Sequence, residues 1–259
     1  MTALLVTTLG VVMAVMLTLW IVSLFIHDVS IVDIYWGIGF IVITWTSHVV
    51  TGADSPRAWL ICAITTLWGL RLTAHLAIRN IGHGEDRRYR AMREHHGATF
   101  PFVSLGTVFV LQGVLMWIIS LPLQAAHALG TDRDLTWIDA LGVGLWAVGL
   151  AFEATADAQL VRFKRSPANV GQVMDRGLWR YSRHPNYFGD FVLWWGFGLV
   201  ALSAGAWWAL AGPTVMSVLL MKVSGVTLLE STIVERRPAY RAYIERTSAF
   251  FPWPPRPRT

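Results

Sequence analysis

The chain has 259 residues, of which 54% are hydrophobic and only 14% are charged, and its mean hydropathy is +0.50. This composition excludes an ordinary soluble domain and indicates a membrane protein. The formal net charge is +5, but the basic residues border apolar segments and no nucleic-acid-binding motif accompanies them. Nucleic acid is therefore not expected as a partner.

Seven apolar segments are long enough to cross a bilayer. We therefore predict an all-α, polytopic fold in which residues 1–259 form a single membrane domain of seven transmembrane helices. The first segment lacks a preceding Lys or Arg and exceeds a usual signal core, so we expect it to remain as an anchor. The predicted spans cover residues 3–26, 31–50, 58–78, 103–126, 135–158, 188–208 and 209–232.

Basic residues concentrate in three polar segments, which together hold 17 of the 21 Lys and Arg residues. The positive-inside rule places such segments in the cytoplasm. We therefore expect a multi-pass membrane protein with an amino terminus outside the cytoplasm and a cytoplasmic carboxyl terminus. The predicted cytoplasmic segments are the loops 79–102 and 159–187 and the tail 233–259.

Charged and polar residues lie inside the predicted spans, where a charge costs roughly 2.5 to 3.5 kcal/mol on insertion scales. Asp33 and Tyr35 begin the second span. Arg71 and His75 lie one turn apart in the third. Any one of them fits a structural salt bridge, but the set together predicts a polar chamber open to the cytoplasm. Its other members are Glu153, Asp157 and Glu230.

The segment RHPNYFGD, residues 183–190, combines a helix start with polar side chains. Proline fits the first turn of a helix, so we expect a helix to begin at this segment. Asn186, Asp190 and Trp194 then recur at four-residue spacing and share one face of that helix. A helix amino terminus beside arginines suits an anionic group, and the phosphate of a cofactor is the natural occupant. The neighbouring residues of interest are Arg176, Arg180, Arg183, Tyr187 and Gly189, the last of which leaves room for a group to approach the backbone.

Several segments resemble a known enzyme family. EATADAQLVRFKR, DRGLWRYSRHP, RHPNYFGD and YRAYIERTSAFFPW are similar to the carboxyl-terminal half of membrane steroid 5-alpha-reductases and related sterol reductases. SIVDIYWGIGF and WGLRLTAHLAIRNIGHGEDRRYRAMR resemble a bacterial branch described mainly as a family of unknown function. The resemblance covers nearly the whole chain, and its bacterial branch implies a protein of the bacterial cytoplasmic membrane with a periplasmic amino terminus. It implies seven spans, NADPH bound between the cytoplasmic halves of the helices, and reduction of a carbon–carbon double bond conjugated to a ketone.

The resemblance also implies which residues contact the cofactor. The family's asparagine and acidic residue fall on Asn186 and Asp190, and Lys164 replaces an arginine, which keeps the charge but loses the planar fork of donors. Glu230 lies near the position of a family histidine, a departure that removes a donor. With candidates added from the basic loops, the expected NADPH contacts are Arg71, Arg88, Tyr89, Asp157, Lys164, Arg176, Arg180, Arg183, Asn186, Tyr187, Asp190, Trp194 and Glu230.

The catalytic residues are less directly indicated, because the glutamate and tyrosine that hold the steroid ketone in animal enzymes have no secure counterpart here. By chemistry alone, Tyr35 is the candidate proton donor, since a phenol stays protonated at neutral pH. Asp33 or His75 would orient it. Tyr35 equally fits an interfacial aromatic belt.

Two other functions remain open. RHPxYxG also occurs in membrane isoprenylcysteine and phospholipid methyltransferases, which bind S-adenosylmethionine, although the many arginines favour a cofactor rich in phosphate. A noncatalytic lipid-binding protein would explain the basic loops but not the intramembrane carboxylates. We expect a monomer without a metal site, whose partners are membrane lipid and a steroid or other enone lipid as substrate.

Overall fold

The computed structural model describes residues 1–130, 134–223 and 238–256. Within these ranges, all regular secondary structure is helical. Five helical segments are long and apolar enough to cross a membrane, so the chain is a helical membrane protein, but the predicted number of seven spans is not confirmed. The five segments are Thr2–Ile26, Ile31–Thr51, Pro56–Asn80, Arg87–Ile119 and Trp137–Arg165.

The chain divides into two compact units. The first contains Met1–Thr136 and Val200–Gly212, and the second contains Trp137–Leu199 and Pro213–Thr259. Each is described by itself below. The prediction of a single membrane domain stays a prediction.

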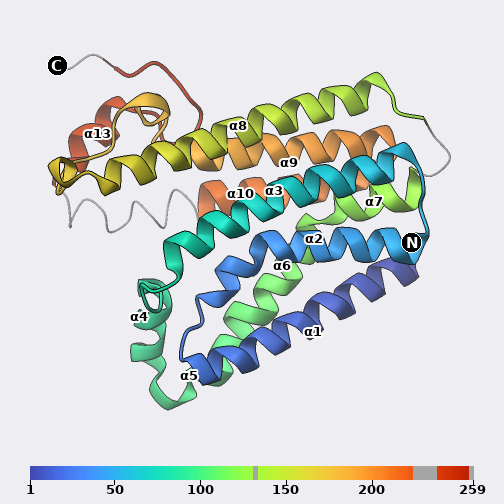
Figure 1. Ribbon diagram of the computed structural model, residues 1–259, viewed down its shortest axis with the longest axis horizontal. Helices are drawn as coiled ribbons and strands as arrows, with labels where there is room; N and C mark the ends of the chain where they lie inside the picture. The colour runs from blue at the N-terminus through green and yellow to red at the C-terminus, as the bar shows by residue number, and fades with distance from the viewer. Residues whose placement is uncertain (131–133, 224–237, 257–259) are drawn as a thin grey trace. The chain divides into compact units, whose positions relative to one another are not determined.

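The first unit begins with three long helices whose limits lie close to the predicted spans (Figure 1): α1 (Thr2–Ile26), α2 (Ile31–Thr51) and α3 (Pro56–Asn80). Helix α2 ends at Gly52, whose left-handed φ of 59° suits a residue without a Cβ. Helix α3 begins at Ser55, whose side chain accepts a hydrogen bond from the backbone of Ala58 at 3.2 Å. These caps confine the turn between α2 and α3 to a few residues.

The fourth predicted span, residues 103–126, is interrupted. Its helix passes through a π-helical turn and stops at Ser120, and a new helix starts with a proline near its beginning. Proline cannot donate to a preceding turn but fits the first turn of a new helix, which explains the break. The elements are α5 (Phe100–Ser104), the π-helix η2 (Leu105–Val110), α6 (Leu111–Ile119) and α7 (Leu121–Leu129).

The predicted cytoplasmic loop 79–102 contains a helix, α4 (Arg87–His96). Asp86 caps it, because its carboxylate accepts a hydrogen bond from the backbone of Arg88 at 2.9 Å. The helix has no long apolar stripe, so hydropathy alone does not find it. A short 3₁₀ turn, η1 (Gly97–Thr99), leads on to α5.

Helices α8 (Trp137–Arg165) and α9 (Pro185–Ser203) lead the second unit, although the last residues of α9 belong to the first. Helix α8 continues well beyond the predicted span 135–158 through polar residues. The remaining described elements are η3 (Pro167–Asn169), η4 (Gly177–Arg180), η5 (Trp207–Leu210), α10 (Ala211–Val218), η6 (Leu219–Val223) and α13 (Tyr240–Arg246).

Helices α8 and α9 approach each other closely through glycines. A Cβ added at Gly189 would lie 2.6 Å from the carbonyl oxygen of Gly149, and one added at Gly196 would lie 2.6 Å from that of Gly142. Small residues allow such close backbone contact between membrane helices. The room predicted beside Gly189 is therefore taken by the backbone of α8.

This packing gives a testable expectation for Gly189→Ala. Its new methyl group should force the two helices apart and cost about 1–3 kcal/mol. Gly144→Ala on α8 is the matched control, because a Cβ there meets no atom within 4 Å. Thermal unfolding in detergent should show a lower melting temperature for Gly189→Ala only. Equal melting temperatures for the two variants would contradict the packing described.

Candidate functional site

Arginines from the loop after α8 and from the carboxyl-terminal segment meet around a cavity of about 540 Å³ in the second unit. This volume lies within the usual range for ligand pockets. Four arginines and one aspartate contribute, so the cavity is strongly basic. We call it the basic cavity. Its lining residues are Asp175, Arg176, Gly177, Arg180, Arg246, Thr247, Pro255 and Arg256.

The arginines of the basic cavity differ in their contacts. Arg246 pairs with Asp175. The exposed side chains of Arg176, Arg180 and Arg256 make no hydrogen bond or ion pair within the part of the chain that the structure describes. Guanidinium groups bind phosphate and carboxylate through paired donors. The cavity can therefore hold an anion.

The turn that carries Arg176 and Arg180 is fixed to α8. Gly177 has a left-handed φ of 59°, which favours glycine, and a Cβ there would lie 2.5 Å from Oε1 of Gln159 and displace that side chain. That same oxygen accepts a hydrogen bond from the backbone of Leu178 at 2.9 Å. The indole of Trp179 donates to the carbonyl of Ala156 at 3.0 Å. These bonds hold η4 against α8.

The start of α9 is tied to the carboxyl-terminal segment. Arg183 is buried, and its Nη1 donates to the carbonyls of Ile244, at 3.1 Å, and Thr247, at 2.5 Å. Tyr243 donates its hydroxyl proton to the carbonyl of Trp179, and burial raises the pKa of this phenol. Arg183 thus has a structural role in the segment that lines the basic cavity. Its expected contact with NADPH stays a prediction.

The face of α9 predicted to bind the cofactor meets α8. Nδ2 of Asn186 donates to Oδ1 of Asp157 at 3.1 Å, so two of the expected cofactor residues are bonded to each other. Tyr187 stacks on His184 with ring centroids 5.6 Å apart. Among the other candidates, Trp194 is fully buried, Asp190 is partly buried and Lys164 is exposed near the end of α8, while Glu230 lies outside the described residues.

In the first unit, α2 and α4 bring three predicted residues together. The carboxylate of Asp33 accepts hydrogen bonds from Nη2 of Arg88 and from the hydroxyl of Tyr89, both at 2.7 Å. Gln112 donates to the same hydroxyl at 3.1 Å and accepts from the indole of Trp36 at 2.5 Å. Neither Gln112 nor Trp36 was expected from the sequence, since nothing in the sequence links α6 to α4.

A second ion pair fixes the segment before α4. Glu85 accepts two hydrogen bonds from Arg93, at 2.7 and 2.9 Å, and one from the backbone of Val29 at 3.0 Å. Burial opposes ionisation of Glu85, but these bonds outweigh it and hold its pKa below the ordinary value. The ionised carboxylate therefore stabilises the link between α2 and α4.

The lowered pKa of Glu85 predicts how stability depends on pH. Its contribution should be complete above the pKa of an unfolded glutamate, about 4.3, and should be lost as pH falls through the lower folded value. Glu85→Gln removes this titration. Melting temperatures from pH 3 to 7 should show the wild type more stable near neutrality, with the difference shrinking in acid. A difference that is constant across this range would contradict the assignment.

The predicted catalytic residues are placed as follows. Tyr35 on α2 is only 8% exposed, and its hydroxyl makes no hydrogen bond within the described residues. Asp33 bonds to Arg88 and Tyr89 rather than to Tyr35. His75 is partly buried on α3, as is Arg71, which was expected to contact the cofactor. The Tyr35 hydroxyl is therefore buried and has no hydrogen-bond partner among the residues that the structure describes.

These features define a helical membrane protein with a basic cavity in one unit and a partly buried polar cluster in the other. A family model for proteins of unknown function, DUF1295, matches residues 19–247. The chain belongs to this family. No solved structure matches it significantly.

Known relatives place the family near a group of reductases. An uncharacterized protein of Schizosaccharomyces pombe is 24% identical in an alignment 270 residues long, and the alignment covers 90% of this chain and 75% of that protein. The 3-oxo-5-alpha-steroid 4-dehydrogenase 1 of Mus musculus is 38% identical over 63 residues, and that of Homo sapiens 34% over 64. Each of these two matches covers 24% of either chain, about a quarter of their length. The relationship to steroid reductases is therefore distant.

Proposed function

We propose that this protein uses NADPH to reduce the carbon–carbon double bond of an enone lipid, with a 3-keto-4-ene steroid as the first candidate substrate. The observation that carries the proposal is the basic cavity, in which three arginine side chains make no hydrogen bond or ion pair to any residue that the structure describes. The distant relationship to 3-oxo-5-alpha-steroid 4-dehydrogenases supports the reaction class.

The lining of the cavity fits the cofactor. Arg176, Arg180 and Arg256 would bind phosphate oxygens of NADPH, while Arg246 stays paired with Asp175. S-adenosylmethionine carries no phosphate and would offer these arginines only its single carboxylate. Asn186 and Asp190 on α9 are the proposed contacts to the sugar or nicotinamide part.

The reduction needs a proton donor or hydrogen-bond donor at the oxygen of the substrate ketone. NADPH, if bound here, would supply a hydride for the beta carbon of the enone, and negative charge would then develop on the ketone oxygen. Tyr35 would donate its hydroxyl proton toward that oxygen, because this buried hydroxyl has no other partner among the described residues.

Binding measurements on the purified full-length protein in detergent separate the candidate functions. We expect NADPH to bind at micromolar or lower concentration and S-adenosylmethionine not to compete with it. Binding of S-adenosylmethionine without NADPH would support the methyltransferase instead. Binding of neither would overturn the proposal and favour a noncatalytic lipid-binding protein.

A further inference from the structure

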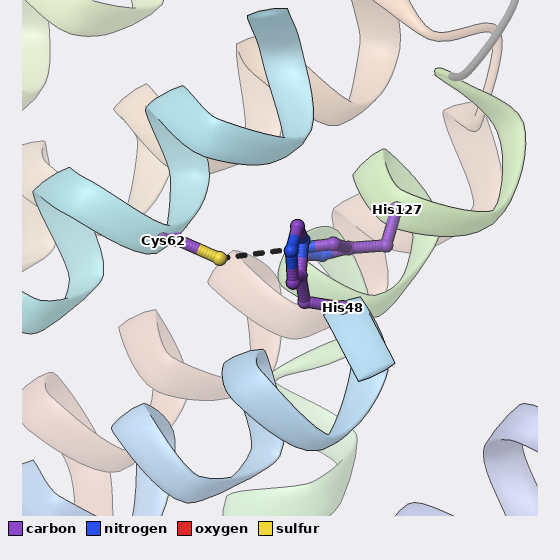
Figure 2. A group of neighbouring side chains, drawn as sticks. All are labelled: His48, Cys62 and His127. Atoms are coloured by element: carbon purple, nitrogen blue, oxygen red, sulfur yellow. Dashed lines mark hydrogen bonds between the residues drawn. The ribbon is translucent and has the colours of Figure 1, made fainter. Parts of the chain in front are cut away.

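Three side chains of types that can ligate a metal ion meet in the first unit, apart from the groups described above. His48 lies near the end of α2, Cys62 on α3 and His127 on α7, and the three point toward one another (Figure 2). One ligand atom from each lies within 4.8 Å of the other two. Cys62 and His127 are buried, and His48 is partly buried.

The hydrogen bonds of His127 set which of its nitrogens is free to act as a ligand. Its Nδ1 lies 2.8 Å from the carbonyl oxygen of Leu123. A carbonyl only accepts, so Nδ1 carries the proton and Nε2 keeps its lone pair. Nε2 lies 3.4 Å from Sγ of Cys62. A backbone carbonyl that fixes the ring in this way is the usual outer partner of a metal-binding histidine.

The ring of His48 is held beside the other two side chains. It packs on Trp59 with centroids 4.6 Å apart and on His127 at 5.8 Å. Trp59 is itself fixed by a hydrogen bond of 2.7 Å to Asp54. Nδ1 of His48 is buried and makes no hydrogen bond within the ranges that the structure describes. A buried nitrogen in this state is costly, and a metal ion would satisfy it.

We propose that His48, Cys62 and His127 bind one soft, closed-shell metal ion, and that this ion is Cu⁺ rather than Zn²⁺. Metal-to-ligand distances of about 2.0–2.3 Å place the ligand atoms of such a site about 3.3–3.8 Å apart. The side chains therefore need to close by about 1 Å, a small rotation. On binding, the Cys62 thiol releases its proton to solvent and the sulfur bonds the metal.

Charge distinguishes the two ions. One thiolate with two neutral imidazoles makes a neutral site with Cu⁺ but a cationic one with Zn²⁺, and uncompensated charge is costly among buried apolar groups. A metal ion at this site would differ from the expectation of a chain without a metal site.

Competition titrations test the proposal. Full-length protein in detergent, kept reduced and free of oxygen, is titrated with Cu⁺ against a chromogenic Cu⁺ chelator and with Zn²⁺ against a zinc chelator. We expect one Cu⁺ per chain, and a loss of affinity of more than about 100-fold in Cys62→Ser and His127→Gln, more than an outer partner contributes. His83→Gln, at an exposed histidine, should bind as the wild type does. Wild-type affinity in both ligand variants would overturn the proposal, as would preferential binding of Zn²⁺.

X-ray absorption spectroscopy of the wild-type protein keeps the proposal testable even if the variants do not fold. At the copper edge, the loaded wild-type protein should show one sulfur and two imidazole nitrogens as nearest neighbours. A spectrum without a sulfur neighbour would overturn the proposal regardless of the variants.

Discussion

Replacing both Arg176 and Arg180 with alanine should weaken NADPH binding by at least about 100-fold. Both guanidinium groups line the basic cavity and make no hydrogen bond or ion pair within the described residues, so their donors are available to phosphate. Hydrogen bonds to charged groups contribute about 1.5–3 kcal/mol each, which corresponds to roughly tenfold to a hundredfold in affinity per arginine. Equilibrium binding of NADPH to purified protein measures the effect.

The control for this pair is Arg241→Ala. Arg241 is an exposed arginine of α13 that does not line the cavity, so its loss tests the general effect of removing positive charge. It should leave affinity within about twofold of the wild type, because an exposed charge that touches no ligand contributes little. An equal loss of NADPH affinity in the double variant and in Arg241→Ala would mean that net charge, rather than the basic cavity, attracts NADPH. Affinity unchanged in both would remove the cavity from the cofactor site.

Tyr35→Phe should lower turnover of the enone by about 100-fold to 1,000-fold and leave NADPH affinity unchanged. Removing one donor to a developing oxyanion has an effect of this size. The change deletes only the hydroxyl, which has no partner to lose among the described residues, so the fold should tolerate it. Steady-state kinetics and binding titrations on the same preparation separate the two quantities.

Tyr181→Phe is the comparison for Tyr35→Phe, because Tyr181 is 42% exposed and its side chain has no role in the proposal. It should turn over like the wild type. Full activity in Tyr35→Phe would show that this residue is a packing or interfacial tyrosine. A parallel loss of NADPH affinity would place it in the cofactor site instead.

Hydropathy predicted the helices of the first unit well. Residues 3–26, 31–50 and 58–78 were expected to span, and α1, α2 and α3 have nearly these limits. Hydropathy did not predict the helices correctly where the limits of a helix differ from those of an apolar segment. Helix α8 continues into polar residues, α4 has no apolar stripe, and Pro122 starts a second helix inside one apolar run. The capping aspartate before α4 was the signal that could have revealed that helix.

The candidate site was predicted only where its residues are close in sequence. Arg176 and Arg180 were predicted to bind the cofactor because they shortly precede the helix start at Pro185. Arg246 and Arg256 were missed, because their approach to the cavity depends on tertiary contacts such as the pair with Asp175. The cluster of His48, Cys62 and His127 was missed for the same reason, since three helices contribute one residue each.

Transfer of a labelled hydride tests the central claim most directly. The purified full-length protein is given NADPH carrying deuterium at the reactive nicotinamide carbon, with a 3-keto-4-ene steroid as substrate. The proposal predicts a reduced steroid with one deuterium at the beta carbon and an unlabelled hydrogen at the alpha carbon, as detected by mass spectrometry and NMR. No deuterium in this steroid or in any of a panel of other enone lipids would contradict it, most clearly if the same preparation transferred a methyl group from S-adenosylmethionine.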